Sequence, residues 1–220
     1  MNVVIAGGKG LIGSGIRDGL VEDEHGVYVI DLPKTNVTCE PAVRLAAHTY
    51  RNVDVVINCV ATKKKGFALP TTEFYLDEWQ EIMNGNVTSG FLLAKHFAPY
   101  MNKGGCFIFF SSIYGVKAPD PKLYEGVDFN TPLIYSVTKS AIIGMTRHLA
   151  TELAPDIRVN CISPGGVYSN QPDKFVDKYT DRTPLKRMTK VEDIVEAVKF
   201  LMASKYVTGQ NIIVDGGFTL

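Results

Sequence analysis

Asn2-Val-Val-Ile-Ala-Gly-Gly-Lys-Gly-Leu-Ile-Gly13 decides the fold, because a short apolar run passes into a glycine-rich turn and then into a helical pattern. Gly7 and Gly10 permit a tight turn with close backbone approach, and Gly13 lets the helix pack closely on the strand. The positive end of such a helix is suited to a pyrophosphate group. The stretch therefore predicts a strand, a phosphate-binding turn and a helix that runs to about Leu20.

The next apolar run, Gly26-Val-Tyr-Val-Ile-Asp31, ends in a carboxylate. An acid some 20 residues after such a turn binds the 2′-hydroxyl of a ribose and repels a 2′-phosphate. Asp31 therefore favours NAD over NADP, whereas the nearby cation of Lys34 opposes that preference. The structural alternative is that Asp31 only caps a turn before Pro33.

The remaining pattern predicts a single α/β domain over residues 1–220. Apolar runs suited to strands buried on both faces of a parallel sheet occur at 54–61, 105–112, 157–163 and 211–215. Helical patterns alternate with them at about 76–101, 133–153 and 191–202. We therefore expect a doubly wound parallel sheet with helices on both faces. Too few residues separate Asp31 from the helix at about 40–50 for a crossover helix, so the sheet should be trimmed at that edge.

Composition describes an ordinary globular protein, with 45% hydrophobic and 21% charged residues. The 23 basic residues balance 23 acidic ones, which gives no electrostatic reason to expect a nucleic-acid partner. No stretch approaches the roughly 20 apolar residues of a membrane span, and no cleavable leader precedes the first strand. We therefore expect a cytoplasmic protein with no membrane partner. The four cysteines form no Cys-x-x-Cys pair, so no metal site is expected.

Leu133-Ile-Tyr-Ser-Val-Thr-Lys-Ser-Ala141 holds the main candidate for chemistry, because Tyr135 and Lys139 are four residues apart. An α-helix has about 3.6 residues per turn, so positions i and i+4 lie on one face. A neighbouring ammonium favours the phenolate, and we expect Lys139 to lower the pKa of Tyr135 for acid–base work on a hydroxyl or carbonyl. Taken alone, the pair also fits a solvated helix surface.

Further motifs follow one another in a fixed order along the chain. They are the glycine turn, Asn58, Asn86, Ser112, Tyr135-x-x-x-Lys139, Ser163-Pro-Gly165 and Tyr206-Val-Thr-Gly-Gln-Asn-Ile-Ile-Val-Asp-Gly-Gly217. This ordered set resembles the short-chain dehydrogenase/reductase family from the first strand to the last. The resemblance implies a Rossmann fold, a nicotinamide cofactor and reversible oxidation of an alcohol.

The resemblance also implies a role for each of four catalytic residues. Tyr135 is the general acid/base, and Lys139 lowers its pKa and binds the ribose. Ser112 donates a hydrogen bond to the substrate oxygen, and Asn86 holds a proton-relay water. Taken alone, Ser112 and Asn86 fit a strand end and a helix polar residue bonded to nearby backbone.

A wider set is implied to hold the cofactor. Its members are Gly7, Lys9, Gly10, Leu11, Ile12, Gly13, Asp31, Leu32, Asn58, Cys59, Val60, Ala61, Asn86, Tyr135, Lys139, Pro164, Gly165, Val167 and Ser169. The resemblance places Ser163 to Val167 beside the nicotinamide and Ser169 at its carboxamide.

The chain departs from the standard family pattern in several places, among them Asn58-Cys-Val-Ala61, which replaces the usual Asn-Asn-Ala-Gly. Leu11 occupies the position of the middle glycine, a spacing more like the extended subfamily that acts on nucleotide sugars. The 23-residue interval from Ser112 to Tyr135 is also longer than in standard reductases. The C-terminal half is of the standard type, and there is no room for the extended group's substrate domain. This combination faintly resembles reductases of surface-glycan and nonulosonic-acid loci.

The favoured interpretation is an NAD(H)-dependent oxidoreductase that interconverts an alcohol and a carbonyl on a small polar substrate, such as a sugar or sugar-derived acid. A polar flap at about 168–189, with Asn170, Gln171, Lys174 and Lys178, is expected to face that substrate. Two alternatives stay open: a nucleotide-sugar epimerase or dehydratase with tightly bound NAD, and a regulator that binds NAD without chemistry. The resemblance also implies a homodimer or homotetramer formed through the helices near 76–101 and 133–153.

Overall fold

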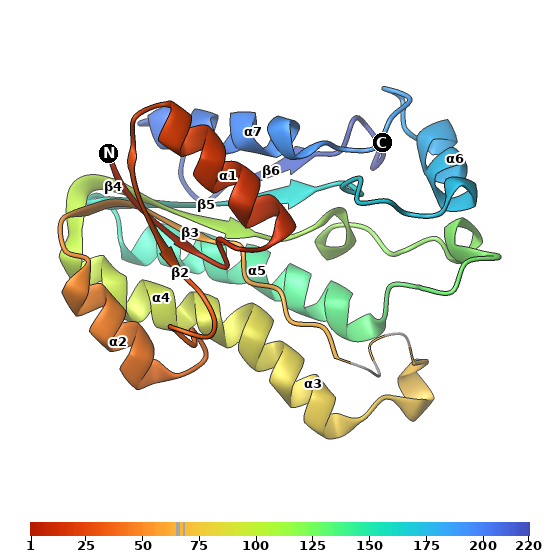
Figure 1. Ribbon diagram of the computed structural model, residues 1–220, viewed down its shortest axis with the longest axis horizontal. Helices are drawn as coiled ribbons and strands as arrows, with labels where there is room; N and C mark the ends of the chain where they lie inside the picture. The colour runs from red at the N-terminus through yellow and green to blue at the C-terminus, as the bar shows by residue number, and fades with distance from the viewer. Residues whose placement is uncertain (65–66, 68) are drawn as a thin grey trace.

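The computed structural model describes residues 1–64, 67 and 69–220, and within them a six-stranded parallel sheet has the order β2-β1-β3-β4-β5-β6 (Figure 1). The strands are β1 (Asn2–Ala6), β2 (Gly26–Ile30), β3 (Val53–Asn58), β4 (Met101–Phe110), β5 (Ile157–Pro164) and β6 (Asn211–Val214). The chain runs from β1 outward to β2 and then returns to the other side of β1 for β3. Ligands bind at such a switch point, in the crevice outside the carboxyl ends of the strands.

Helices cover both faces of the sheet, with α1 and α7 on one face and α2, α4 and α5 on the other (Figure 1). The helices are α1 (Leu11–Glu22), α2 (Glu40–Thr49), α3 (Leu76–Met83), α4 (Ser89–Phe97), α5 (Leu133–Glu152), α6 (Asp173–Arg182) and α7 (Val191–Ala203). Short 3₁₀ turns lie at Thr71–Glu73, Ala98–Tyr100, Ile113–Gly115 and Pro121–Tyr124. The predicted doubly wound α/β fold is therefore confirmed.

Alternation along each strand divides the core between the two faces. In β1, Val3 and Ile5 pack with α1 and α7, whereas Val4 and Ala6 pack with α2, α4 and α5. All four side chains are fully buried. The continuous apolar runs in the sequence are thus explained by a sheet that is covered on both sides.

The sheet is trimmed beside β2, as the short connection in the sequence predicts. Residues 31–39 form turns and irregular backbone, and α2 begins at Glu40. β2 is consequently an edge strand that pairs with β1 alone.

The helix expected over 76–101 is confirmed in part, because it is interrupted at its centre. A π-helical turn, η3 (Asn84–Thr88), separates α3 from α4, and Met101 already belongs to β4. Such wide turns are rare and often mark functional sites. Asn86 lies in this turn and is buried.

A third, smaller core lies beyond the carboxyl ends of the strands, where α6 packs against the long segment between Ser112 and α5 (Figure 1). Phe175 and Tyr179 of α6 are buried there with Leu123. This core covers the carboxyl end of the sheet, where the switch point lies.

In the part of the chain that the structure describes, no helix combines the length and the apolar character needed to cross a bilayer.

Candidate active site

The glycine turn brings the first strand and the first helix into close contact. Gly7 adopts a φ of +74°, and a Cβ on it would lie 2.9 Å from the backbone nitrogen of Val60. A Cβ on Gly13 would collide with the carbonyl oxygen of Gly7. Both positions need glycine, and the tips of β1 and β3 can then approach the start of α1.

The N-terminus of α1 is available to an anion. Gly10 precedes the helix, no side chain of the described residues caps it, and its first turn contains no acidic residue. Leu11 and Ile12, in that first turn, line the main cavity of this end of the molecule. The first amides of a helix have no intrahelical acceptor, so this turn fits the pyrophosphate of a dinucleotide.

Asp31 lies at the tip of β2 and is hydrogen-bonded to the glycine turn. Its carboxylate accepts hydrogen bonds from the amides of Lys9, at 3.0 Å, and Leu32, at 2.8 Å. The Lys9 ammonium donates to the carbonyl of Leu32 at 2.8 Å. The cluster brings a carboxylate and a cation to one place, so it offers donors and acceptors to a ribose and also a positive charge.

A cavity of about 370 Å³ opens at the carboxyl ends of the strands. The predicted site residues that line it are Leu11, Ile12, Cys59, Ala61, Ser112, Tyr135, Lys139, Pro164, Gly165, Val167 and Ser169. The other predicted residues lie outside its lining: Gly7, Lys9, Gly10 and Gly13 in or beside the turn, Asp31 and Leu32 at the tip of β2, and Asn58, Val60 and Asn86 at or behind the end of β3.

Tyr135 and Lys139 lie on one face of α5, as their spacing predicts, with the Lys139 Nζ 5.6 Å from the centre of the Tyr135 ring. Lys139 is 4% exposed, and its ammonium donates to the Phe110 carbonyl at 2.8 Å. Burial lowers the pKa of Lys139 to about 8, because a charged ammonium is poorly solvated there.

The expected direction of the Tyr135 pKa is wrong. Burial raises the pKa of Tyr135, and a side-chain hydrogen bond with Ser112 only partly opposes the rise. The four-residue spacing shows the nearby cation but not the loss of water around the phenol, and desolvation disfavours the phenolate. Tyr135 is therefore a protonated donor at neutral pH.

Ser112 follows β4 and stands at the base of the cavity, 6% exposed. Its hydroxyl bonds to the Tyr135 side chain and accepts from the amide of Tyr114 at 3.2 Å. The adjacent Ser111 hydroxyl donates to the Lys139 carbonyl at 2.7 Å, which joins the end of β4 to α5. Two hydroxyl groups, of Ser112 and Tyr135, thus converge on one region of the cavity.

Asn86 and Asn58 support the site from behind its wall. The Asn86 side chain accepts from the Thr62 amide at 2.6 Å and donates to the Thr138 hydroxyl at 3.3 Å. The Asn58 side chain accepts from the Val60 amide at 3.1 Å. Both fix the loop after β3, and Asn86 also links that loop to α5. A water-holding role for Asn86 stays a prediction.

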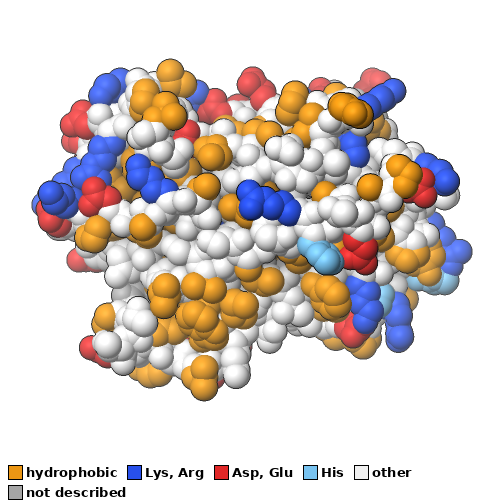
Figure 2. Space-filling model, turned by 180° about the vertical axis from the view of Figure 1, so that it is seen from behind, with side chains coloured by type: hydrophobic (Ala, Val, Ile, Leu, Met, Phe, Trp, Pro, Cys, Tyr) orange, Lys and Arg blue, Asp and Glu red, His pale blue; other side chains and the backbone are white. Residues whose placement is uncertain are grey.

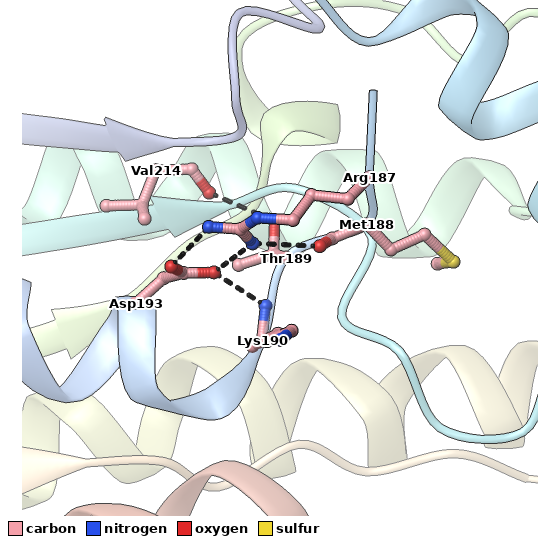
Figure 3. A network of polar contacts seen from close by, with 6 residues as sticks. All are labelled: Arg187, Met188, Thr189, Lys190, Asp193 and Val214. Atoms are coloured by element: carbon pink, nitrogen blue, oxygen red, sulfur yellow. Dashed lines mark hydrogen bonds and ion pairs between the residues drawn. The ribbon is translucent and has the colours of Figure 1, made fainter. Parts of the chain in front are cut away.

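The loop after β5 is held by a network around α7. Figure 3 shows Arg187 donating to both carboxylate oxygens of Asp193, at 2.6 and 2.7 Å. This hydrogen bond lowers the pKa of Asp193. The neighbouring Thr189 amide donates to the Gly166 carbonyl at 3.0 Å, and its hydroxyl donates to the Val214 carbonyl at 3.4 Å. The network fixes the backbone of the loop that follows Pro164.

The polar flap predicted at 168–189 is only partly correct. Gln171 lines the cavity, but in the described part of the chain Lys174 and Lys178 do not. The Lys178 ammonium donates to the carbonyls of Lys122 and Glu125, at 2.9 and 3.0 Å. A helix shows one face inward, and in α6 that face carries aromatic residues while the lysines hold the neighbouring segment.

The sequence interpretation missed an aromatic wall on the side of the cavity opposite the glycine turn. Its members are Tyr114, Tyr124, Phe129, Phe175 and Tyr179. Their rings contact one another, with Phe129 and Phe175 centred 5.0 Å apart. The sequence feature that could have indicated this wall is the long interval before Tyr135, which is rich in Tyr and Pro. The length of this interval shows that an additional segment is present, but it does not show where the aromatic rings of the segment point.

The residues present fit a nicotinamide dinucleotide, since the first turn of an uncapped helix and a buried lysine line one cavity, and a strand-tip carboxylate is bonded to the adjoining glycine turn. Comparisons with known proteins agree with this fit. A family model described as enoyl-(acyl carrier protein) reductase matches residues 21–219. Tropinone reductase-like 3 of Erythroxylum coca is 34% identical over 177 residues, which are 76% of this chain and 64% of that protein.

Two other relatives extend the comparison. Post-translational flagellin modification protein A of Campylobacter coli is 33% identical over 193 residues, covering 85% of this chain and 75% of the relative. A short-chain dehydrogenase from Leptospira borgpetersenii, solved with bound NAD⁺, is 32% identical with a TM-score of 0.89, covering 99% of this chain and 92% of that one. The chain spans slightly less than two thirds of the first plant relatives, 64% and 63% of their lengths.

Proposed function

The chain belongs to the short-chain dehydrogenase/reductase family, and we propose that it is an NAD(H)-dependent oxidoreductase that interconverts an alcohol and a carbonyl. The observation that carries the proposal is the convergence of Ser112, Tyr135 and Lys139 on one cavity beside the start of α1. Acid–base chemistry on an oxygen needs a proton donor within hydrogen-bond reach and a means to stabilise the charge that develops.

The protein side of the reaction is a proton transfer. A bound nicotinamide supplies or accepts the hydride at the substrate carbon. Ser112 and Tyr135 donate hydrogen bonds to the substrate oxygen, and in reduction Tyr135 gives its proton to that oxygen. Lys139 then stabilises the phenolate by its charge. Burial raises the pKa of Tyr135, so at neutral pH the phenol holds the proton that it gives to the substrate oxygen in reduction.

NAD is the proposed cofactor in preference to NADP. The carboxylate of Asp31 at the tip of β2 supports this choice, because it would repel a 2′-phosphate. The Lys9 ammonium, which reaches the carbonyl of the next residue, opposes it. Equilibrium binding of NADH and NADPH, followed by protein fluorescence, measures the preference directly.

A compact, oxygen-rich substrate of the sugar or sugar-acid class is the proposed reactant. The cavity of about 370 Å³ lies at the small end of ligand sites, and Asn130, Thr131 and Gln171 add polar groups to its aromatic wall. One relative, at 33% identity, is named for flagellin modification, which is compatible with a role in modifying a surface protein.

The test is a screen of polyols, sugars and keto acids, read by NADH absorbance with NADPH as the control. Net consumption of free cofactor supports the proposal. A substrate that is converted with no net change in free NADH would instead identify an epimerase or dehydratase with a retained cofactor. Binding of NAD with no conversion of any compound, together with an intact function in Tyr135→Phe, would identify a regulator.

We further propose a cytoplasmic homodimer or homotetramer that pairs through α4 and α5. Phe91 is half exposed on α4, and the groove between the two helices is lined by Met145, Leu149 and Ala94. Figure 2 shows a dense group of hydrophobic side chains in the region of α3, at the lower left of that view. Gly144 lies in the groove, and a Cβ on it would meet no atom within 4 Å in one copy.

Gly144→Arg should therefore leave the fold intact and block a partner. Size-exclusion chromatography with light scattering should return a multiple of the chain mass for the original protein and for Glu22→Arg, an exposed change on α1, but the chain mass for Gly144→Arg. A monomer in all three proteins would refute the pairing, and cell fractionation tests the location.

A further inference from the structure

The segment between Ser112 and α5 contributes a chain of three hydroxyl groups to the cavity. The Tyr124 hydroxyl donates to the Tyr114 hydroxyl at 2.7 Å, and the Thr131 hydroxyl lies 2.7 Å from the Tyr124 oxygen. A phenol has one proton, and that of Tyr124 is already used. Thr131 must therefore be the donor to Tyr124, and the order Thr131 to Tyr124 to Tyr114 follows.

Within the part of the protein that the structure describes, the last proton of this hydroxyl series has no partner. Among the described residues, the Tyr114 hydroxyl accepts from Tyr124 but has no recorded acceptor for its own proton. All three residues line the same cavity as Ser112 and Tyr135. The free O–H of Tyr114 is thus available to a ligand in that cavity.

The surrounding rings hold the chain in place. The Tyr124 ring packs edge-on against Phe129, with centroids 5.8 Å apart, and at a tilt against Phe175, with centroids 5.7 Å apart. Burial raises the pKa of both Tyr114 and Tyr124, so both remain protonated at neutral pH. A donor that already accepts a hydrogen bond is a stronger donor, because hydrogen bonds in a chain polarise one another.

We propose that Tyr114, supported by Tyr124 and Thr131, binds a second oxygen of the substrate, close to the carbonyl that Ser112 and Tyr135 bind. This inference rests on the proposed function, and it names the substrate class as a carbonyl compound with a neighbouring carbonyl, hydroxyl or carboxylate. The wall selects against a compound that has a methylene at that position, because the buried donor would be left unpaired.

The test compares diacetyl with methyl ethyl ketone, in which a methylene replaces one of the two carbonyl groups. With NADH, Tyr114→Phe should lower kcat/KM for diacetyl about ten-fold, since a lost hydrogen bond of about 1.4 kcal/mol is ten-fold. It should change kcat/KM for methyl ethyl ketone less than about two-fold. Tyr124→Phe should give a smaller loss for diacetyl, and the exposed control Tyr206→Phe should change neither value. An equal loss for both ketones would mean that Tyr114 is only structural.

A second measurement separates this inference from the proposed function. Both ketones are titrated into the complex with NAD⁺, in which neither can be reduced. The inference predicts tighter binding of diacetyl by the original protein and loss of that preference in Tyr114→Phe. No preference in the original protein, or one that survives in Tyr114→Phe, overturns the inference. A preference without any reduction by NADH would instead refute only the oxidoreductase activity.

Discussion

The two ends of the cavity are built in different ways. The cofactor end is made of backbone, with a tight turn at Gly7, the uncapped start of α1 and two amides around Asp31. The substrate end is made of side chains, such as Tyr114 and Phe175, that come from segments far apart in the chain. A site made of backbone can bind the same cofactor whatever the substrate is. A wall of side chains, in contrast, fits one class of substrate. The difference teaches that the cofactor end sets the reaction class and the substrate end sets the reactant.

The largest effect is expected from a substitution at Tyr135, where the cofactor end and the substrate end of the cavity meet. Tyr135→Phe removes the proton donor and should lower kcat by about 10³-fold, within the range of general acid–base catalysis. Because the change leaves the ring and the glycine turn intact, NADH affinity should stay within about two-fold. Steady-state kinetics and fluorescence titration measure the two quantities. Retained turnover in this variant would remove Tyr135 from the mechanism.

Lys139→Met should lower turnover but stabilise the fold by about 3.5 kcal/mol below pH 8, because an ammonium buried at a depressed pKa costs about 1.4 kcal/mol per pKa unit. The folded pKa is about 8 and the unfolded value is 10.5, so the unfolded chain holds more protons between these values. The stability of the original protein should therefore rise with pH in that window.

Thermal melts of both proteins from pH 6 to pH 10 measure the gap in stability between Lys139→Met and the original protein. It should be constant up to about pH 8 and then narrow. A stability difference that stays constant from pH 8 to pH 10 would show that the pKa of Lys139 is not lowered in the folded state.

Asp31→Ser tests the cofactor end alone. It should raise the affinity for NADPH relative to NADH about ten-fold, because a carboxylate no longer faces the 2′-phosphate. Asp18→Ser, an exposed change on α1, is the matched control. Preference among substrates should not change in either variant. An unaltered cofactor ratio in Asp31→Ser would place the ribose elsewhere.

The smallest effect is expected at Lys178, and it tests whether this residue lies outside the substrate end of the cavity. Lys178→Met removes a cation that donates to backbone carbonyls outside the cavity lining, so KM for any substrate should change less than about two-fold. Lys186→Met, in the turn after α6, serves as the control, because the Lys186 ammonium also donates to a backbone carbonyl. A large rise in KM for an acidic substrate would restore Lys178 to the substrate-binding role that the sequence predicts.

The sequence predicts features that depend on spacing and backbone. The glycines of the turn, the acid after β2 and the four-residue step from Tyr135 to Lys139 all lie where their pattern indicates. Features that depend on packing escape prediction. The pKa of Tyr135 follows burial, which no local pattern reports, and the inward face of α6 depends on a segment about fifty residues earlier in the chain, to which Lys178 donates.

The π-helical turn η3 sets the rotational register of the helix that contains it. One residue more or less in an α-helix turns everything beyond it by about 100°. Deleting one residue from Asn84–Thr88 would therefore either swing Leu93 and Phe97 away from the sheet or withdraw Asn86 from Thr62 and Thr138. One widened turn thus allows a single helix to serve the core along one half and the active site at its centre, and its length should tolerate neither insertion nor deletion.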